Sequence, residues 1–246
     1  SAAGPARFIF DTISGNIVAW APGVDPNIGS AEIKASTPGA VYTGLALATS
    51  KKGGDQLYAA NFGQSRVDVF NSSFQPVKEP SWAFKDIFVP KKFAPFNVQA
   101  INGNVFVTYA EPDPTTGREV IGKGLGIVDE FTADGRFVAR IATGGALNAP
   151  WGVAIAPSSW GKLAGSLLIG NFGDGRVNVL APLGHGRFAP FVVGQLTDSA
   201  TGKPFAEPGL WSLTPGTATT GGTDSIFFSA GLDGETHGLI GVLRKS

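Results

Sequence analysis

The residues of this chain that are suited to ligand or metal chemistry are spread along its whole length of 246 residues. Carboxylate and amide oxygens are the ligands that a hard cation such as Ca²⁺ prefers, and aromatic walls with a few polar groups are typical of pockets for small molecules. We therefore predict two sets of site residues. The candidate metal ligands are Asp11, Asn61 and Asn171. The candidate ligand-binding residues are Tyr42, Asn97, Tyr109, Trp151 and Trp211.

Each of these residues also has a purely structural interpretation, which the sequence leaves open. Asparagine side chains commonly hydrogen-bond the backbone of a turn, and this is the favoured role of Asn61 and Asn171. Trp151 and Trp211 are favoured as caps over the inner ends of strands rather than as surfaces on which a sugar stacks. Neither alternative is decided by residue type alone.

Other catalytic chemistries find little support in the sequence. The chain has no cysteine, so it has no disulfide or thiolate nucleophile. Its two histidines, His185 and His237, lack a second histidine at zinc-ligand spacing. No Gly-x-Ser-x-Gly elbow is present. Carboxylates that could act in acid–base catalysis occur at Glu111, Asp113, Asp129 and Glu130, but no residue is assigned a catalytic role.

Composition restricts the class of protein further. Lys plus Arg and Asp plus Glu number 19 each, so no net field attracts nucleic acid or an anionic membrane. No apolar run is long enough to span a bilayer. The 35 glycines and 17 prolines, beside 43% hydrophobic residues, favour many short strands joined by tight turns.

A repeated hairpin indicates how distant residues are brought together. Residues 56–70 and 166–180 each contain an apolar strand, an Asn-Phe-Gly turn and an alternating Arg-Val-x-Val strand, 110 residues apart. Corresponding strand ends fall at intervals of 50, 48, 62 and 59 residues. These strand ends are Asp11, Asn61, Tyr109, Asn171 and Ala230.

This period, with four short strands per unit and no helical periodicity, predicts an all-β β-propeller with four-stranded blades. A β-sandwich is the rival, but it would not repeat this hairpin at this spacing. We expect residues 1–246 to form a single propeller domain of about five blades, from a six-bladed parent. In a propeller, the loops before the inner strands and after the second strands meet on one face, which would gather the candidate site residues there.

Two further repeated features accompany the hairpins. Asp174-Gly175 and Asp233-Gly234-Glu235 fall on corresponding loops of the last two units, where they could bind Ca²⁺ or simply form turns. Arg66 and Arg176 follow the same turn in two units, which favours a structural role for each.

The repeat Leu-Tyr-Ala-Ala-Asn-Phe-Gly-Gln-Ser-Arg-Val-Asp-Val-Phe is similar to that of NHL-type propellers. Over nearly its whole length the chain resembles a family of uncharacterised secreted propellers, largely bacterial, some with PEP-CTERM sorting signals. The matching stretches include Pro150-Trp151-Gly152-Val153-Ala154 and Ala230-Gly231-Leu232-Asp233-Gly234. The resemblance implies a secreted, extracellular or periplasmic location, but no reaction and no catalytic residues.

The resemblance also implies repeats that lie ahead of Phe8. Relatives carry about one and a half more repeats, and Phe8 starts where a second strand should be, without its innermost partner. The last unit has only three evident strands. We therefore expect a missing N-terminal segment or a second chain to complete the ring.

The leading functional prediction is a secreted binding or scaffold protein with no assigned catalytic activity. The first alternative is a metal-dependent hydrolase or lactonase with its site at the channel mouth. The second alternative is a glycan-binding module. The expected partner is a small molecule or a glycan, with Ca²⁺ as the candidate cofactor.

Overall fold

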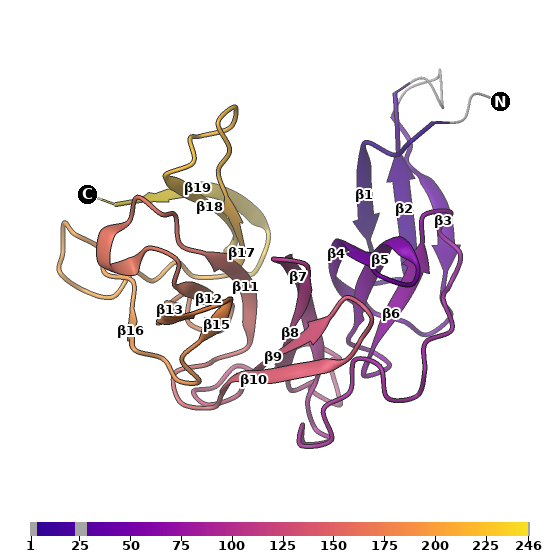
Figure 1. Ribbon diagram of the computed structural model, residues 1–246, viewed down its shortest axis with the longest axis horizontal. Helices are drawn as coiled ribbons and strands as arrows, with labels where there is room; N and C mark the ends of the chain where they lie inside the picture. Colours follow the sequence, from indigo (N-terminus) through magenta and orange to yellow (C-terminus); the bar gives the residue numbers. More distant parts are fainter. Residues whose placement is uncertain (1–3, 23–28, 246) are drawn as a thin grey trace.

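Apolar residues at every second position and tight turns fold the chain into five successive antiparallel sheets (Figure 1). The computed structural model describes residues 4–22 and 29–245. The sheets follow one another around an arc, and the second to fifth sheets contribute their first strands, β4, β7, β11 and β17, to its inner side. This arrangement confirms the predicted β-propeller fold.

The bounds of the strands are as follows. The first sheet contains β1 (Phe8–Asp11), β2 (Asn16–Trp20) and β3 (Glu32–Ser36), and the second contains β4 (Tyr42–Ser50), β5 (Gly54–Asn61) and β6 (Arg66–Asn71). The third contains β7 (Ala94–Ile101), β8 (Asn104–Ala110), β9 (Ile127–Thr132) and β10 (Phe137–Thr143). The fourth contains β11 (Pro150–Ile155), β12 (Leu167–Asn171), β13 (Val177–Leu180) and β16 (Gly194–Gln195). The fifth contains β17 (Leu210–Pro215), β18 (Ser225–Leu232) and β19 (His237–Arg244). A small separate hairpin joins β14 (Pro182–Gly184) to β15 (Arg187–Phe188).

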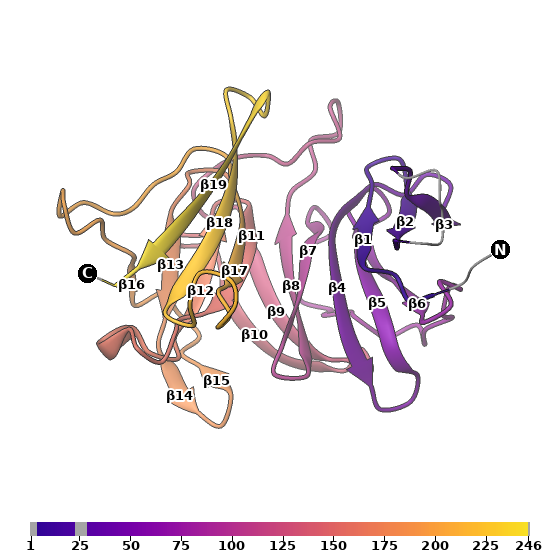
Figure 2. The same ribbon diagram turned by 90° about the horizontal axis from the view of Figure 1, so that it is seen from above.

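Both Asn-Phe-Gly hairpins form as the sequence predicts. Asn61 ends β5 opposite Arg66 of β6, and the backbone N–H of Asn171 at the end of β12 donates to the carbonyl of Arg176. These turns, together with the loops that lead into the inner strands, form one end of the sheets, which we call the loop face. It is uppermost in Figure 2.

The second sheet has a shorter outer edge than expected. Its predicted outer strand near Pro76 is reduced to an isolated bridge between Phe70 and Pro76 and one hydrogen bond from Val77 N–H to the Val69 carbonyl. Proline has no N–H to donate to a ladder, so a segment containing Pro76 and Pro80 cannot continue as a paired strand.

Each pair of neighbouring sheets encloses its own apolar layer. Tyr42, Leu57 and Phe70 pack between the first and second sheets. Tyr58, Val107 and Phe131 pack between the second and third, and further layers follow around the arc. The only helix in the described ranges is the 3₁₀ turn Gly161–Leu163, and none there is long or apolar enough to cross a membrane.

Candidate functional site

Three inner strands are tied together just below the loop face. The Thr43 hydroxyl of β4 donates to the Phe96 carbonyl of β7 at 2.7 Å. Asn97 Nδ2 donates to the Trp151 carbonyl of β11 at 2.8 Å, and Trp151 Nε1 donates back to the Thr43 carbonyl at 2.7 Å. This closed set of bonds fixes the inner ends of the second, third and fourth sheets relative to one another.

Gly44 makes this close approach possible. A Cβ atom at Gly44 would lie 2.1 Å from Asn97 Oδ1, well inside contact distance. The Gly44 N–H also donates to the Asp11 carboxylate, and burial is the main reason that the pKa of Asp11 is raised. Asp11 Oδ2 is buried and has no hydrogen-bond partner. One carboxylate oxygen therefore lies uncompensated beside the tied inner strands.

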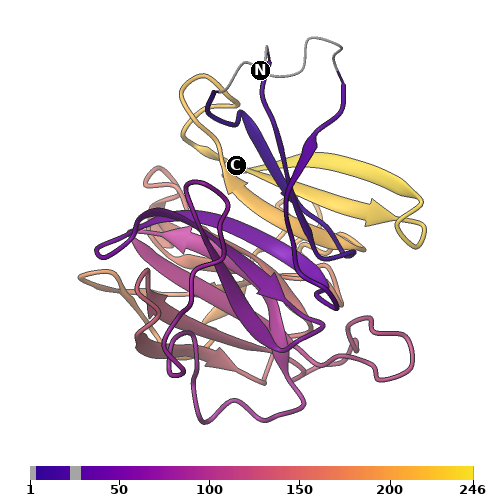
Figure 3. The same ribbon diagram turned by 90° about the vertical axis from the view of Figure 1, so that its right-hand side faces the viewer.

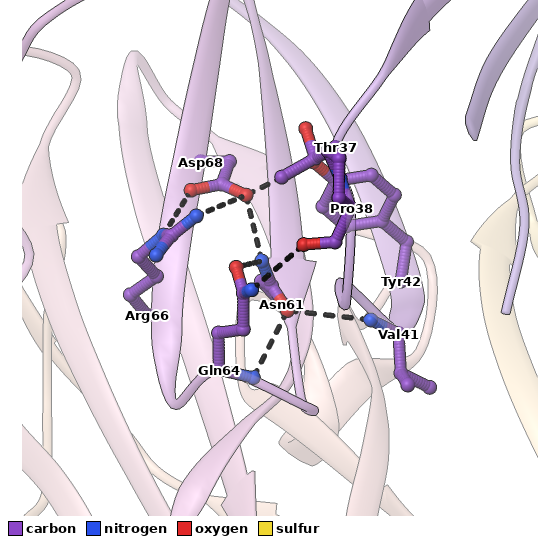
Figure 4. Close-up of polar contacts among 8 residues, drawn as sticks. All are labelled: Thr37, Pro38, Val41, Tyr42, Asn61, Gln64, Arg66 and Asp68. Atoms are coloured by element: carbon purple, nitrogen blue, oxygen red, sulfur yellow. Dashed lines mark hydrogen bonds and ion pairs between the residues drawn. The ribbon is translucent and has the colours of Figure 1, made fainter. Parts of the chain in front are cut away.

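The side-chain amide of Asn61 makes hydrogen bonds at all of its donor and acceptor positions (Figure 4). Its Oδ1 accepts from the backbone N–H of Val41 at 3.3 Å and of Gln64 at 3.1 Å. Its Nδ2 donates to Gln64 Oε1 at 3.0 Å and to Asp68 Oδ2 at 2.7 Å. A carboxamide has two donor and two acceptor positions, and Asn61 fills all four.

Tyr42 belongs to the same network. Its hydroxyl donates to Asp68 Oδ2 at 2.9 Å and accepts from the Thr37 hydroxyl at 2.8 Å. Arg66 Nε donates to Asp68 Oδ1 at 2.5 Å. Burial is the main reason that the pKa of Tyr42 is raised; the hydrogen bond with Thr37 opposes this rise, and the charge of Asp68 adds to it. Asp68 thus joins the turn residue Asn61 to Tyr42 and Arg66, and this supports a structural role for the repeated arginine in this unit.

Asn171 is held in a similar way in the fourth sheet. Its Nδ2 donates to the Ala146 carbonyl at 2.9 Å and to Asp174 Oδ1 at 3.0 Å. Its Oδ1 accepts from Asn178 Nδ2 at 3.1 Å. These contacts agree with the turn-supporting role that the sequence left open.

The three predicted metal ligands do not all face one interface, because Asn171 lies apart from Asp11 and Asn61. Ile9, two residues before Asp11, packs with Leu57 and Ala59 between the first and second sheets. Because side chains alternate along a strand, Asp11 faces this interface from the first sheet and Asn61 faces it from the second. Asn171 follows Ile169, which packs between the third and fourth sheets. The described residues contain no group of three or more His, Asp or Glu side chains that could hold a metal ion.

The donor set consequently does not fit a cation held by all three residues. Only the Oδ2 atom of Asp11 is a buried oxygen without a partner, whereas the Asn61 and Asn171 amides are engaged elsewhere. The metal role of these residues stays a prediction, and no chemical step below passes through a metal.

The predicted ligand-binding residues divide into two groups. Tyr109 is buried in the layer between the second and third sheets, and burial raises its pKa well above its ordinary value. Trp151 and Trp211 lie at the loop face in edge-to-face contact at 5.5 Å and pack on an aromatic cluster. The cluster contains Phe62, Phe96 and Phe172.

A hollow of about 660 Å³ lies beside this cluster on the loop face. It is formed by the ends of β12 and β18, the segment before β17 and the long loop between β8 and β9. Its charged lining residues are Arg118, Glu119, Asp174, Asp233 and Glu235, and its apolar ones include Ile121 and Phe172. Two other hollows, of about 400 and 330 Å³, lie near the opposite ends of the strands.

Two carboxylates hold the Arg118 guanidinium in this hollow. It donates to Glu235 Oε2 at 2.6 Å and to Glu119 Oε1 at 3.1 Å. The hydrogen bond to Glu235 is the main reason that the pKa of Arg118 is raised. Glu235 in turn accepts from Trp211 Nε1 at 3.1 Å, so the aromatic cluster and the charged hollow are directly connected.

The loop that carries Glu235 adopts an uncommon backbone. Asp233, Gly234 and Glu235 all have positive φ, of 51°, 66° and 70°. Non-glycine residues rarely adopt this conformation, and where they do the surrounding structure must hold them there. Here the contacts of Glu235 with Arg118 and Trp211 supply that support.

Sequence reasoning identified part of this hollow. It singled out the corresponding loops with Asp174 and Asp233 to Glu235, but it did not select Arg118 or Glu119. The available signal was the unusual length of the polar loop between Ala110 and Gly124. Arg118 and Glu235 are 117 residues apart, so no local pattern could pair them.

The chain is similar in sequence to proteins that are themselves uncharacterised. No protein-family model matches the chain. The uncharacterized protein R648 of Acanthamoeba polyphaga mimivirus is 33% identical over 236 residues, which are 94% of this chain and 55% of that protein. A second such protein of the same virus, L690, is 33% identical over 208 residues, 83% of this chain and 52% of its own length. The chain spans about half the length of these curated relatives.

Solved structures confirm the fold. A structural-genomics protein assigned as a gluconolactonase has a TM-score of 0.58 at 20% identity, covering 96% of this chain and 73% of the other. XC5397 from Xanthomonas campestris, a gluconolactonase, has a TM-score of 0.53 at 14% identity, covering 90% and 78%. The WD40 propeller domain of Doa1 has a TM-score of 0.53 at 8% identity, covering 99% and 63%.

These comparisons correct the leading functional prediction. We expected a binding or scaffold protein with no assigned catalytic activity, and that prediction is wrong, because the solved structures with a similar fold include gluconolactonases. A hydrolase or lactonase was the first alternative that the sequence offered.

Proposed function

We propose that this protein hydrolyses lactones of the sugar-acid type in the hollow on its loop face. The observation that carries the proposal is the clamped Arg118 facing the same hollow as the Asp174 carboxylate. A guanidinium is a fixed cation that can hold a carbonyl oxygen or a developing oxyanion. The similarity of the fold to gluconolactonases supports the choice of lactones as the substrate class.

The surroundings of Asp174 suit it to activating water. Its Oδ1 accepts from Asn171 Nδ2 at 3.0 Å and from the Arg176 backbone N–H at 3.2 Å. These two donors fix the carboxylate, so that Oδ2 is directed to a constant position. A general base must be held within hydrogen-bond reach of the proton that it removes.

The reaction then needs only these groups and water. Asp174 takes a proton from water while the water oxygen attacks the carbonyl carbon of the lactone. The charge that develops on the carbonyl oxygen is stabilised by Arg118, whose contacts within the described residues use two of its five N–H donors. The bond from the carbonyl carbon to the ring oxygen breaks, the ring oxygen takes the proton, and an open hydroxy acid leaves.

The test is hydrolysis of glucono-δ-lactone followed in a pH-stat, with the spontaneous rate subtracted. Asp174→Asn keeps the shape of the side chain and the acceptor for Asn171, so we expect a folded protein with kcat lowered by about 10²–10⁴-fold. Asp55→Asn, at the opposite end of the second sheet, is the matched control and should retain full activity. A wild-type rate equal to the spontaneous rate on both δ- and γ-lactones would refute the proposal.

The finer features implied by the resemblance also remain part of this proposal. Secretion and PEP-CTERM association rest on the similarity of the repeats to those of uncharacterised secreted propellers. Fractionation of cells expressing the native gene tests the location directly. Recovery of the protein only in the cytoplasmic fraction would contradict secretion.

A further inference from the structure

The first sheet leaves one face uncovered. In its register, Phe8 lies opposite Trp20, Phe10 opposite Val18, and Val18 opposite Ile33. Residues that lie directly opposite each other share a face of the sheet. This set, which we call the first-sheet face, is strongly exposed: the exposed fractions are 57% for Phe8, 51% for Phe10 and 63% for Ile33.

The first-sheet face lies at one end of the arc. Figures 1 and 3 show that the first sheet (indigo) and the fifth sheet (yellow) lie on the same side of the molecule, at the two ends of the series of five sheets. The fifth sheet also exposes apolar residues on its outer strand, with Ile240 78% and Val242 42% exposed. Two apolar sheet faces therefore border the open part of the ring.

The contacts of its turn identify β1 as a second strand, not an inner one. The Thr37 N–H donates to the Gly15 carbonyl at 2.8 Å, and the Ala40 N–H donates to the Thr37 carbonyl. In the fourth sheet the Glu207 N–H donates in the same way to the Gly175 carbonyl at 3.0 Å, and the Leu210 N–H donates to the Glu207 carbonyl.

Both glycines lie too close to the following segment to leave room for a side chain. A Cβ at Gly15 would lie 2.5 Å from the Thr37 carbonyl oxygen, and one at Gly175 would lie 2.0 Å from that of Glu207. The hairpin β1–β2 is therefore the counterpart of β12–β13. Since β12 pairs with the inner strand β11, β1 has an edge where an inner strand belongs. Within residues 4–22 and 29–245, no strand pairs with that edge.

We propose that the β1 edge and the first-sheet face receive a further β-sheet repeat, carried by additional polypeptide joined ahead of β1. Its last strand pairs antiparallel with β1 as the inner strand, and a neighbouring sheet covers Phe8, Phe10 and Ile33. The strand has the alternating apolar pattern of Tyr42–Ser50, which fills the same position in the second sheet.

Two observations favour added polypeptide over another occupant. The chain spans 55% and 52% of two curated relatives, so proteins of this kind carry further sequence. The N-terminal end of β1 also lies at the end of the sheets where the inner strand β4 turns into β5 through Ser50 and Gly54. A turn of that length suffices to connect an inner strand to β1.

The proposal is tested by adding such a strand. A copy of residues 41–55 is joined directly to Arg7, which places the copied turn in the register that leads from β4 into β5. We expect amide hydrogen exchange of Phe8–Asp11 to slow by at least about tenfold and the melting temperature to rise. The control extension has the same composition in shuffled order and should change neither quantity.

Every other outcome counts against the proposal. If the β1 amides are already protected in the unextended chain as a monomer, the edge is not open. If the unextended chain sediments as a dimer that protects β1, a second copy is the occupant and the proposal is wrong. If the fused protein does not fold, a synthetic peptide of residues 41–50 added to the unextended chain should slow exchange of β1, and its failure to do so would overturn the proposal.

Discussion

Replacing Gly44 by alanine should strongly destabilise the protein through the tied inner strands. The added Cβ would lie 2.1 Å from Asn97 Oδ1 and 2.9 Å from Asn97 Cα. Overpacking of this kind costs about 1–3 kcal/mol. Displacement of Asn97 would also break its bond to the Trp151 carbonyl and leave a buried amide unpaired, which costs about 1–3 kcal/mol.

The two effects together lower the free energy of unfolding by about 2–6 kcal/mol. For a chain of this size, that corresponds to a fall in melting temperature of roughly 4–24 °C. Differential scanning calorimetry measures the shift, and tryptophan fluorescence reports on Trp151 during the same transition. Gly238→Ala is the control, because no heavy atom lies within 4 Å of its added Cβ. A melting temperature for Gly44→Ala equal to that of the control would refute the reasoning.

Three further predictions follow from individual contacts. Phe131→Ala removes a fully buried ring and should lower the free energy of unfolding by about 3–5 kcal/mol, as measured by urea denaturation. Burial raises the pKa of Asp129 to about 7, despite its ion pair with Arg140. The folded state then holds the proton more tightly than the unfolded state, so this group's contribution to stability should be lost as pH rises from about 4 to about 7. Asp129→Asn should flatten that dependence in pH-dependent thermal melts. Trp211→Phe keeps an aromatic ring but removes the donor to Glu235. We expect it to raise KM for the lactone with little loss of melting temperature. An unchanged KM would show that Trp211 does not affect substrate binding in the hollow.

The repeats could be predicted because their signals are local. An apolar strand, an Asn-Phe-Gly turn and an alternating strand are encoded within about fifteen residues, and both copies form as expected. The position of Asp11 could not be predicted in the same way. The Gly15 N–H donates to the carbonyl of Thr12, three residues earlier, whereas the Gly175 N–H donates to that of Asn171, four residues earlier.

This shorter turn shifts the match by one residue. Thr12, not Asp11, is the counterpart of Asn171, and its hydroxyl accepts from the Asn16 N–H at 3.0 Å. A one-residue shift moves a side chain to the other face of a strand. Asp11 therefore faces the second sheet, a consequence that spacing alone did not reveal.

The charged hollow was beyond sequence reasoning for a different reason. It depends on contacts between segments that are distant in the chain, such as the bond from Arg118 to Glu235. Their residue types are ordinary for surface loops. Only the folded arrangement of the third, fourth and fifth sheets distinguishes them from solvated charges.

The most direct test of the account is the ratio of kcat for wild type and Asp174→Asn on glucono-δ-lactone, measured in a pH-stat on proteins with matching melting temperatures. We predict a wild-type rate above that of the spontaneous reaction and a kcat that is about 10²–10⁴-fold lower for the variant. Equal rates for the two proteins, or no wild-type rate above the spontaneous reaction, would contradict it.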